Sequence, residues 1–396
     1  CTEDALVGVD PDGAPGQGDA TIELELAAGD LPAWRDTTFD GYALASTSGL
    51  RMVASDAEFS ARTLGRFTTV PDSIFLDEEN REVERFENAR LRLVVDTVAS
   101  SLPDAGGTIA ANALATGFDD RRATWSQADD GVPWATPGGD LAESLGTLAL
   151  ESLEADTVFL PFDVDADSLL TSWRAEDGGT GFALSSQTAD LSLTIRQVVL
   201  VFDVKPVGRD TLVETLRSVA PATFIFDPET PQPGLPLRIG GLPATRAYLN
   251  FRLPESVDGT ALRGARINRA TLVLAARPVP DAPFAAGDTL QASVFDLLSD
   301  PFESGPKTPV GLTQGNSVPI APEDVEEGSE VQLPLTGLVQ RWATAEPDSM
   351  PELNVGVRLV PEDGGLPYYE FGSVEDPALA PRLRILLTPE TPFDLP

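Results

Sequence analysis

The chain of 396 residues has no histidine, a single cysteine (Cys1) and only two lysines, Lys205 and Lys307. Without histidine, a Ser-His-Asp triad, Cys-His catalysis and ordinary zinc sites are excluded together. With one cysteine no disulfide can form within the chain, so packing alone must hold the fold. A run of about 18 consecutive apolar residues is also absent, so we expect no helix that spans a bilayer.

Acidic residues outnumber basic ones by 63 to 27, which gives a formal net charge of -36. The negative electrostatic field of such a chain repels nucleic-acid phosphates and anionic lipid headgroups, so we exclude nucleic acid as a partner. Acidic excess with scarce lysine fits a salty habitat, where screening reduces self-repulsion, and equally a GC-rich genome that encodes arginine in place of lysine. The catalytic arrangement that remains is a pair of carboxylates, as in glycosidases. No particular pair can be singled out among 63 acidic residues. We therefore predict that the protein is not an enzyme.

Two stretches, residues 157–186 and 331–361, share one order of features. Each begins with a short apolar strand ending in Leu-Pro and continues with a helical stripe, meaning apolar residues spaced as on one face of a short helix, which ends in a tryptophan. A polar turn and a second strand follow. The two tryptophans, Trp173 and Trp342, are expected in the core. Matching segments on both sides extend the repeat to a period of roughly 180 residues, far longer than a solenoid unit, so we infer a duplicated domain.

Short runs of β-branched and aliphatic residues alternate with turn signals, for which the chain has 34 glycines and 34 prolines. This pattern predicts an all-β protein with two tandem antiparallel β-sandwich domains, jelly-roll-like, with short helices. We place a tether and possible added strand at residues 1–31, the first sandwich at 32–204, a linker at 205–219 and the second sandwich at 220–396.

The N-terminal segment starts with Cys1, followed by the polar stretch TEDALVGVDPDGAPGQGDA. It resembles the start of mature bacterial lipoproteins, whose N-terminal cysteine carries the lipid. The resemblance implies lipidation at Cys1, a flexible tether, and a location at the outer membrane or cell surface. Residues 21–26 then alternate apolar and polar side chains, the period of a half-buried strand. This strand either opens the first domain or adds to a sheet edge of a neighbouring molecule.

Each half of the chain carries short motifs around its tryptophans. In the first half they are Thr124-Trp125, Pro133-Trp134, residues 137–140, FDVDADSLLTSW and residues 181–184; in the second they are LRIGGLPATRAYLNFRLP, LTGLVQRW and residues 354–357 and 381–385. Both sets resemble DNRLRE-type domains, a β-sandwich family related to carbohydrate-binding modules and found in secreted or surface proteins of bacteria and archaea. The second half lacks the Thr-Trp and Gly-Gly-Asp segment, and the first half lacks the Pro-Arg-Leu ending. If the Thr-Trp segment binds a glycan in relatives, only the first half retains that site.

Four aromatic residues in loop-like or strand-edge context are candidates for stacking on a sugar: Trp125, Trp134, Tyr368 and Tyr369. A flat ring can cover the apolar face of a pyranose and so give a glycan-binding surface. The alternative for all four is a packing role in the core, as with other large aromatic side chains.

Three alternating carboxylates, Asp163, Asp165 and Asp167, are candidates for a calcium site, because calcium prefers oxygen ligands. The glycine and the distal glutamate of an EF-hand loop are missing, however. Since the segment leads into a predicted helix, the alternative is that Asp163 or Asp167 caps the helix N-terminus.

The prediction for function is a non-enzymatic, lipid-anchored protein of the cell surface, whose sandwiches bind a polysaccharide or pack into an extracellular structure. The alternative is a structural subunit of a filament, sheath or outer-membrane complex, in which residues 21–26 or a sheet edge join neighbours. Its expected partners are the membrane through the lipid, a polysaccharide, and copies of itself or other surface proteins.

Overall fold

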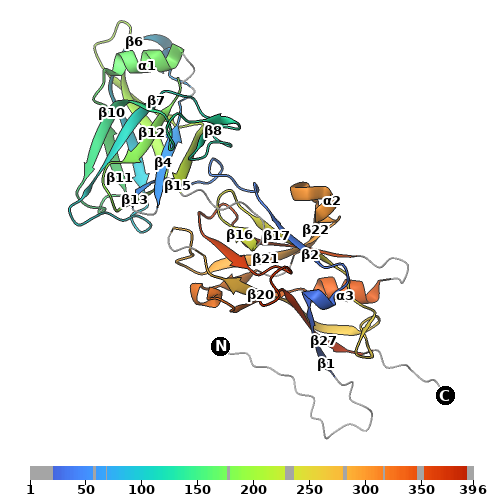
Figure 1. Ribbon diagram of the computed structural model, residues 1–396. Coiled ribbons are helices and arrows are strands. Elements are labelled where there is room, and N and C mark those ends of the chain that lie inside the picture. Colours follow the sequence, from blue (N-terminus) through green and yellow to red (C-terminus); the bar gives the residue numbers. More distant parts are fainter. Residues whose placement is uncertain are drawn as a thin grey trace, which may run out of the picture.

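The computed structural model is built almost entirely from antiparallel strands arranged in two lobes (Figure 1). It describes residues 21–56, 59–67, 69–175, 179–227, 236–279, 283–314, 317–345 and 352–389. The prediction of an all-β fold with two sandwiches and short helices is confirmed. None of the helices in these ranges is long and apolar enough to cross a membrane.

The first sandwich is an eleven-stranded sheet that curls around one core. Its strands are β3 (Arg51–Ser55), β4 (Ser60–Gly65), β5 (Ser73–Leu76), β6 (Glu79–Val95), β7 (Gly107–Leu114), β10 (Leu141–Leu150), β11 (Thr157–Pro161), β12 (Phe182–Ser186), β13 (Leu191–Pro206), β14 (Val213–Ser218) and β15 (Ala222–Asp227). A small hairpin, β8 (Gln127–Asp129) with β9 (Val132–Pro133), and the helix α1 (Ala166–Ala175) lie outside this sheet.

The second sandwich packs two six-stranded sheets around a separate core. One sheet contains β1 (Ile22–Ala27), β16 (Leu237–Gly240), β20 (Arg266–Arg277), β24 (Glu330–Pro334), β26 (Tyr368–Phe371) and β27 (Arg382–Thr388). The other contains β2 (Arg35–Phe39), β17 (Arg246–Phe251), β21 (Leu290–Leu297), β22 (Val310–Gln314), β23 (Val318–Ile320) and β25 (Leu353–Val360). Short elements complete it: the hairpin β18 (Ser256–Val257) and β19 (Thr260–Ala261), the helices α2 (Pro301–Ser304) and α3 (Thr336–Thr344), and the 3-10 turns η1 (Ala28–Asp30), η2 (Gly305–Lys307) and η3 (Pro322–Val325).

The helices α1 and α3 occupy matching places in the two sandwiches and bury the side chains that the helical stripes predict. In α1 these include Leu170 and Trp173, and in α3 Leu338 and Trp342. The Trp173 ring lies 5.2 Å from that of Phe67 in the first core. The prediction that both tryptophans belong to the core is confirmed.

Much of the strand pairing is shared by the two sandwiches, as a duplicated domain predicts. The neighbours of β6 are β11 and β13, and the neighbours of β20 are β24 and β27. Likewise β12 lies between β4 and β7, as β25 lies between β17 and β21. The two halves therefore share this part of their topology, although β3 joins the strands of the first sandwich into a single sheet and the second sandwich has two sheets.

The first two strands of each half complete the sandwich of the other half. Strands β1 and β2, at the start of the chain, pair with β27 and β17 of the second sandwich. The equivalent strands β14 and β15, at the start of the second half, pair with β13 and β4 of the first. In Figure 1 the blue strands β1 and β2 accordingly lie in the orange and red lobe.

This exchange corrects the predicted boundaries at three points. Residues 35–39 form β2 and belong to the second sandwich, not the first. The expected linker at 205–219 contains β14, and the expected second domain begins with β15; both strands complete the first sandwich. The strand predicted at residues 21–26 does pair within the chain, but with the second sandwich. Alternation shows which face of a strand is buried and not which edge it joins, so the pattern could not reveal the exchange.

Candidate functional site

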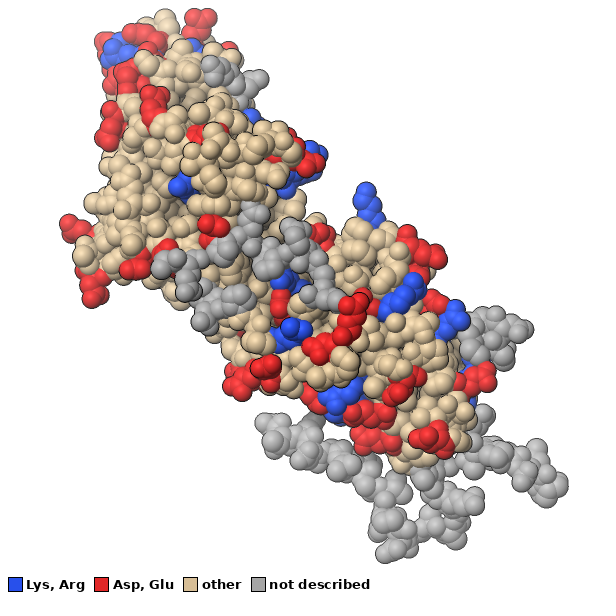
Figure 2. All heavy atoms as spheres, in the orientation of Figure 1, with Lys and Arg blue, Asp and Glu red and all other residues tan. Residues whose placement is uncertain are grey.

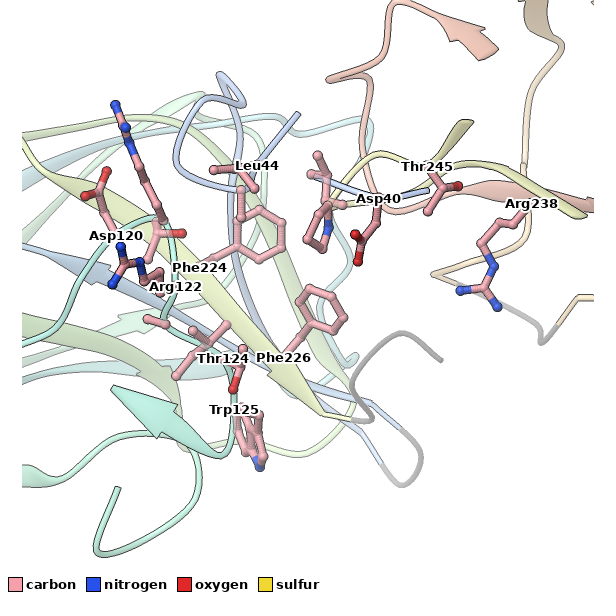
Figure 3. Close-up of a pocket in the computed structure, with 17 residues that line it drawn as sticks. Asp40, Leu44, Asp120, Arg122, Thr124, Trp125, Phe224, Phe226, Arg238 and Thr245 are labelled. Carbon is pink, nitrogen blue, oxygen red and sulfur yellow. The ribbon is translucent and has the colours of Figure 1, made fainter. Parts of the chain in front are cut away.

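A cavity of about 160 Å³ lies between the two sandwiches, bounded by both of them and by the segment that connects β2 to β3 (Figure 3). We call it the cleft. Strand β15 forms its floor, the loop before β8 forms one wall, and β16 with the turn that follows it forms the opposite wall. Clefts at domain interfaces are common places for ligands.

The floor consists of Phe224 and Phe226, which share one face of β15 because they are two residues apart. Behind the cleft, Phe284 of the second sandwich lies 5.8 Å from Phe59 and 6.0 Å from Phe226, both of the first, measured between ring centroids. Phe284 also lies 6.0 Å from Tyr368 in its own sandwich. This buried aromatic cluster joins the sandwiches, so the cleft is formed before any ligand arrives.

The wall from the first sandwich presents Trp125, which is half-buried. The guanidinium carbon of Arg62 lies 5.1 Å from the centre of its ring, and Arg62 Nη1 donates to the Gly138 carbonyl at 2.6 Å. A Cβ atom at Gly138 would lie 2.8 Å from both Arg62 Nη1 and Trp125 Cζ2, and φ there is +89°, so glycine suits this position. Burial lowers the pKa of Arg62 from its ordinary value. The indole is therefore held at a fixed angle at the rim.

The opposite wall contains Arg238, only 4% of which is exposed. Its Nη2 lies 2.5 Å from Glu370 Oε1, and its guanidinium carbon lies 4.2 Å from the centre of the Tyr368 ring. The backbone N–H of Arg238 donates to Thr38 Oγ1 of β2 at 2.9 Å. This arginine is thus oriented by contacts with two strands of the second sandwich, β26 and β2.

Charged side chains of both signs line the cleft. Asp120, Arg121 and Arg122 come from the first sandwich, and Asp40 follows β2. Figure 3 shows Phe224 and Phe226 between Asp120, Arg122 and Trp125 on one side and Asp40 and Arg238 on the other. On the face seen in Figure 2, acidic side chains are spread over both lobes, and a few basic ones lie near the junction. The cleft is therefore mixed in charge although the chain as a whole is strongly acidic.

Of the four aromatic candidates from the sequence, Trp125 lines the cleft and the other three are buried. Trp134 is 5% exposed, and its indole N–H donates to the Thr124 carbonyl at 2.9 Å, which supports the loop that carries Trp125. Tyr368 and Tyr369 are each 1% exposed, and the Tyr369 hydroxyl donates to the Ile320 carbonyl at 2.9 Å. These three contribute packing and not an accessible stacking face.

The three aspartates suggested for calcium make separate contacts around α1. Asp165 Oδ2 accepts from the Ser168 N–H at 2.8 Å, which caps the helix, and the hydrogen bonds from Ser168 lower the pKa of Asp165. Asp167 Oδ1 accepts from the Phe86 N–H at 2.9 Å, and the Asp163 N–H donates to the Leu145 carbonyl at 2.7 Å. Within the described ranges no group of three His, Cys, Asp or Glu side chains could hold a metal ion. A carboxylate does cap the helix, but it is Asp165 and not Asp163 or Asp167, because Asp165 is the residue directly before α1. The lipidation predicted at Cys1 concerns a residue outside the described ranges.

Sequence reasoning missed the rest of the cleft, including Phe224, Phe226, Arg238 and Asp40. Asp40 is distant in sequence from the other three, and the exchange of β2 and β15 between the sandwiches brings them to one interface. The one available signal was the Phe-Ile-Phe alternation at 224–226, which indicates a strand with one aromatic face.

Comparison with known proteins identifies no family for this chain. No family model matches it, and no curated protein matches it. Among solved structures, that of the Macrobrachium rosenbergii nodavirus aligns over 98% of this chain and 95% of its own, at 11% identity and a TM-score of 0.16. The structure of infectious bursal disease virus, Gx strain, aligns over 91% of this chain and 77% of its own, at 10% identity and a TM-score of 0.14. Both TM-scores are too low to indicate a shared fold.

Proposed function

We propose that the protein is a non-enzymatic surface module that binds a neutral sugar residue of a polysaccharide in the cleft between its sandwiches. The observation that carries the proposal is the half-buried ring of Trp125 at the rim of a preformed cavity lined by both apolar and hydrogen-bonding side chains. Few well-placed polar groups on a mostly apolar lining are typical of small-molecule sites.

The size of the cleft supports a ligand with a single ring. At about 160 Å³ it is close to an engineered protein cavity of about 150 Å³ that accepts benzene. A space of this size suits a single pyranose ring at most. The neighbouring sugar units of the polymer extend into solvent.

The chemistry of the lining supports a neutral, hydroxyl-rich ligand. The indole of Trp125 and the ring of Phe226 offer apolar faces, and the carboxylates of Asp40 and Asp120 accept hydrogen bonds from hydroxyl groups. Because Arg121 and Arg122 line the same cleft as these carboxylates, no concentrated charge of one sign favours an ionic ligand. A charged polysaccharide is correspondingly disfavoured.

The rigidity of the site supports useful affinity despite its small area. The aromatic cluster around Phe284 fixes the distance between the walls, and the contacts of Arg62 and Gly138 fix Trp125. A preformed site loses less entropy on binding than one that must be ordered by its ligand.

Affinity electrophoresis of the full chain through gels containing neutral polysaccharides tests the proposal, with Phe159→Ala as a matched control. Phe159 is an exposed aromatic residue under Arg90, as Trp125 lies under Arg62, but it is on β11, away from the cleft. We expect one neutral polymer to retard the wild type and Phe159→Ala equally. Trp125→Ala and Asp120→Asn should each weaken binding at least about tenfold, the factor that corresponds to about 1.4 kcal/mol.

Two outcomes would overturn the proposal. One is that no neutral polysaccharide retards the wild type. The other is that both cleft variants, shown to be folded by circular dichroism, bind as tightly as Phe159→Ala does.

A further inference from the structure

The exchange of strands between the sandwiches is reciprocal, as in a domain-swapped dimer, although both partners lie on one chain. One connection leaves β2 in the second sandwich at Phe39 and reaches β3 in the first at Arg51. The other leaves β15 in the first sandwich at Asp227 and reaches β16 in the second at Leu237. Exchange of identical elements between copies is a low-cost route to association.

The two exchanged strand pairs differ in how they are attached to the sandwich that they complete. Strand β14 follows its partner β13 directly, with only residues 207–212 between them. This hairpin ties β14 and β15 to the first sandwich locally. Strand β1 instead pairs with β27, at the opposite end of the chain, and no short loop joins the two. The covalent connection of β1 and β2 leads to the first sandwich, through residues 40–50.

The place that β1 and β2 occupy on the second sandwich is specific for these strands. The side chain of Leu26 is 5% exposed against the second core, and the Trp34 ring stacks on Phe251 at 4.6 Å. Glu25 forms ion pairs with Arg382 and Arg384 of β27. None of these contacts involves the first sandwich, so each would form equally well with strands from another molecule.

We infer that residues 21–39 are an exchangeable donor segment, which completes the second sandwich of another copy of this chain and thereby links molecules. The partner is a second copy because only the same sequence supplies Leu26, Trp34 and Glu25 in the required register. The segment between Leu44 and Leu50 acts as the hinge, because Tyr42 and Ala43, whose backbones hydrogen-bond to Ala244 of the second sandwich, move together with the donor strands. This inference does not depend on what the cleft binds.

Disulfide trapping in the full chain tests the inference. In a Cys1→Ser background, Glu25→Cys and Arg384→Cys are placed on separate chains that carry tags of different size. These positions face each other directly in the β1–β27 register, and directly opposed residues of antiparallel strands have Cα atoms close enough for a disulfide. The chains are mixed at high concentration, warmed to just below the melting temperature, cooled and oxidised.

The matched control uses the equivalent strand pair of the first sandwich. Asp203→Cys and Glu214→Cys face each other in the β13–β14 register, where the hairpin keeps the strands on one chain. We expect the Glu25/Arg384 mixture to give a disulfide-linked heterodimer at a yield several times that of the Asp203/Glu214 mixture. Equal yields, or no heterodimer in the first mixture while one chain carrying both cysteines closes its own disulfide, would refute the inference.

Light scattering of the untreated wild type provides a second measurement that needs no substitution. After the same warming at high concentration, we expect species with two or more times the mass of one chain, which return slowly to monomers on dilution. A protein that remains monomeric at every concentration tested would also refute donor exchange.

Discussion

Replacing Glu25 with glutamine tests whether ion pairs hold β1 on the second sandwich. Glu25 Oε1 lies 3.1 Å from Arg382 Nη1, and Glu25 Oε2 lies 2.7 Å from Arg384 Nε. Glu330 of β24 pairs with the same two arginines, so both keep an acidic partner in the variant. The substitution therefore removes two attractions without leaving a charge unpaired.

The expected loss is modest because these groups are partly exposed. A solvent-exposed ion pair contributes about 0.2–1 kcal/mol, so two of them amount to roughly 1 kcal/mol. If the free energy needed to detach β1 locally from the sheet falls by this amount, the population of molecules with β1 detached rises about fivefold. Hydrogen exchange followed by mass spectrometry on peptides from residues 21–30 measures this directly.

The matched control is Glu23→Gln, on the same strand. Glu23 is exposed and forms no ion pair with any described residue. We expect its exchange rates to equal those of the wild type. In 1 M salt, where the screening length falls to about 3 Å, the difference between Glu25→Gln and the wild type should shrink.

The same prediction has a defined pH dependence. Hydrogen bonds from Arg384 hold the pKa of both Glu25 and Glu330 below the ordinary value of 4.5. For carboxylates with depressed pKa values, the stabilisation is present above the unfolded value and is lost as the pH falls through the folded one. The difference between the variant and the wild type should therefore disappear on acidification below 4.5. Equal exchange in Glu25→Gln and Glu23→Gln at neutral pH and low salt would refute the ion-pair argument.

Two further predictions concern packing and ionisation. A Cβ atom at Gly146 would lie 2.1 Å from the Pro161 carbonyl oxygen, so Gly146→Ala should lower the free energy of unfolding in urea by about 1–3 kcal/mol. Gly29→Ala, where nothing lies within 4 Å of the added atom, should change it by less than about 0.5 kcal/mol, and equal effects would contradict the close contact. Burial raises the pKa of Tyr369 from 10.0 to about 12, so its contribution to stability should be intact below pH 10.0 and fall away as the pH approaches 12. Ultraviolet titration of the wild type against Tyr369→Phe measures this, and an ionisation near pH 10 would count against the burial of that hydroxyl.

The local features of this protein follow from its sequence because they depend on residues close together in the chain. The spacing around Trp173 and Trp342 predicts short helices with a buried stripe, and both helices bury those side chains. The alternation at residues 21–26 predicts a strand, and β1 occupies Ile22–Ala27. The turn-rich composition predicts an all-β fold, and the shared motifs predict a repeated domain, which the strand pairing bears out.

The tertiary structure alone decided which sheet each strand joins and therefore where the cleft lies. The backbone groups along a strand edge are alike whatever the sequence, so alternation at β1 and β14 says nothing of their partners. Whether Trp125 and Trp134 face solvent or core depends on how the loop before β8 packs, which neighbouring residues in the chain do not reveal. Phe226, Asp40 and Trp125 meet because strand exchange brings distant segments to one interface, a result of long-range packing that no local pattern encodes.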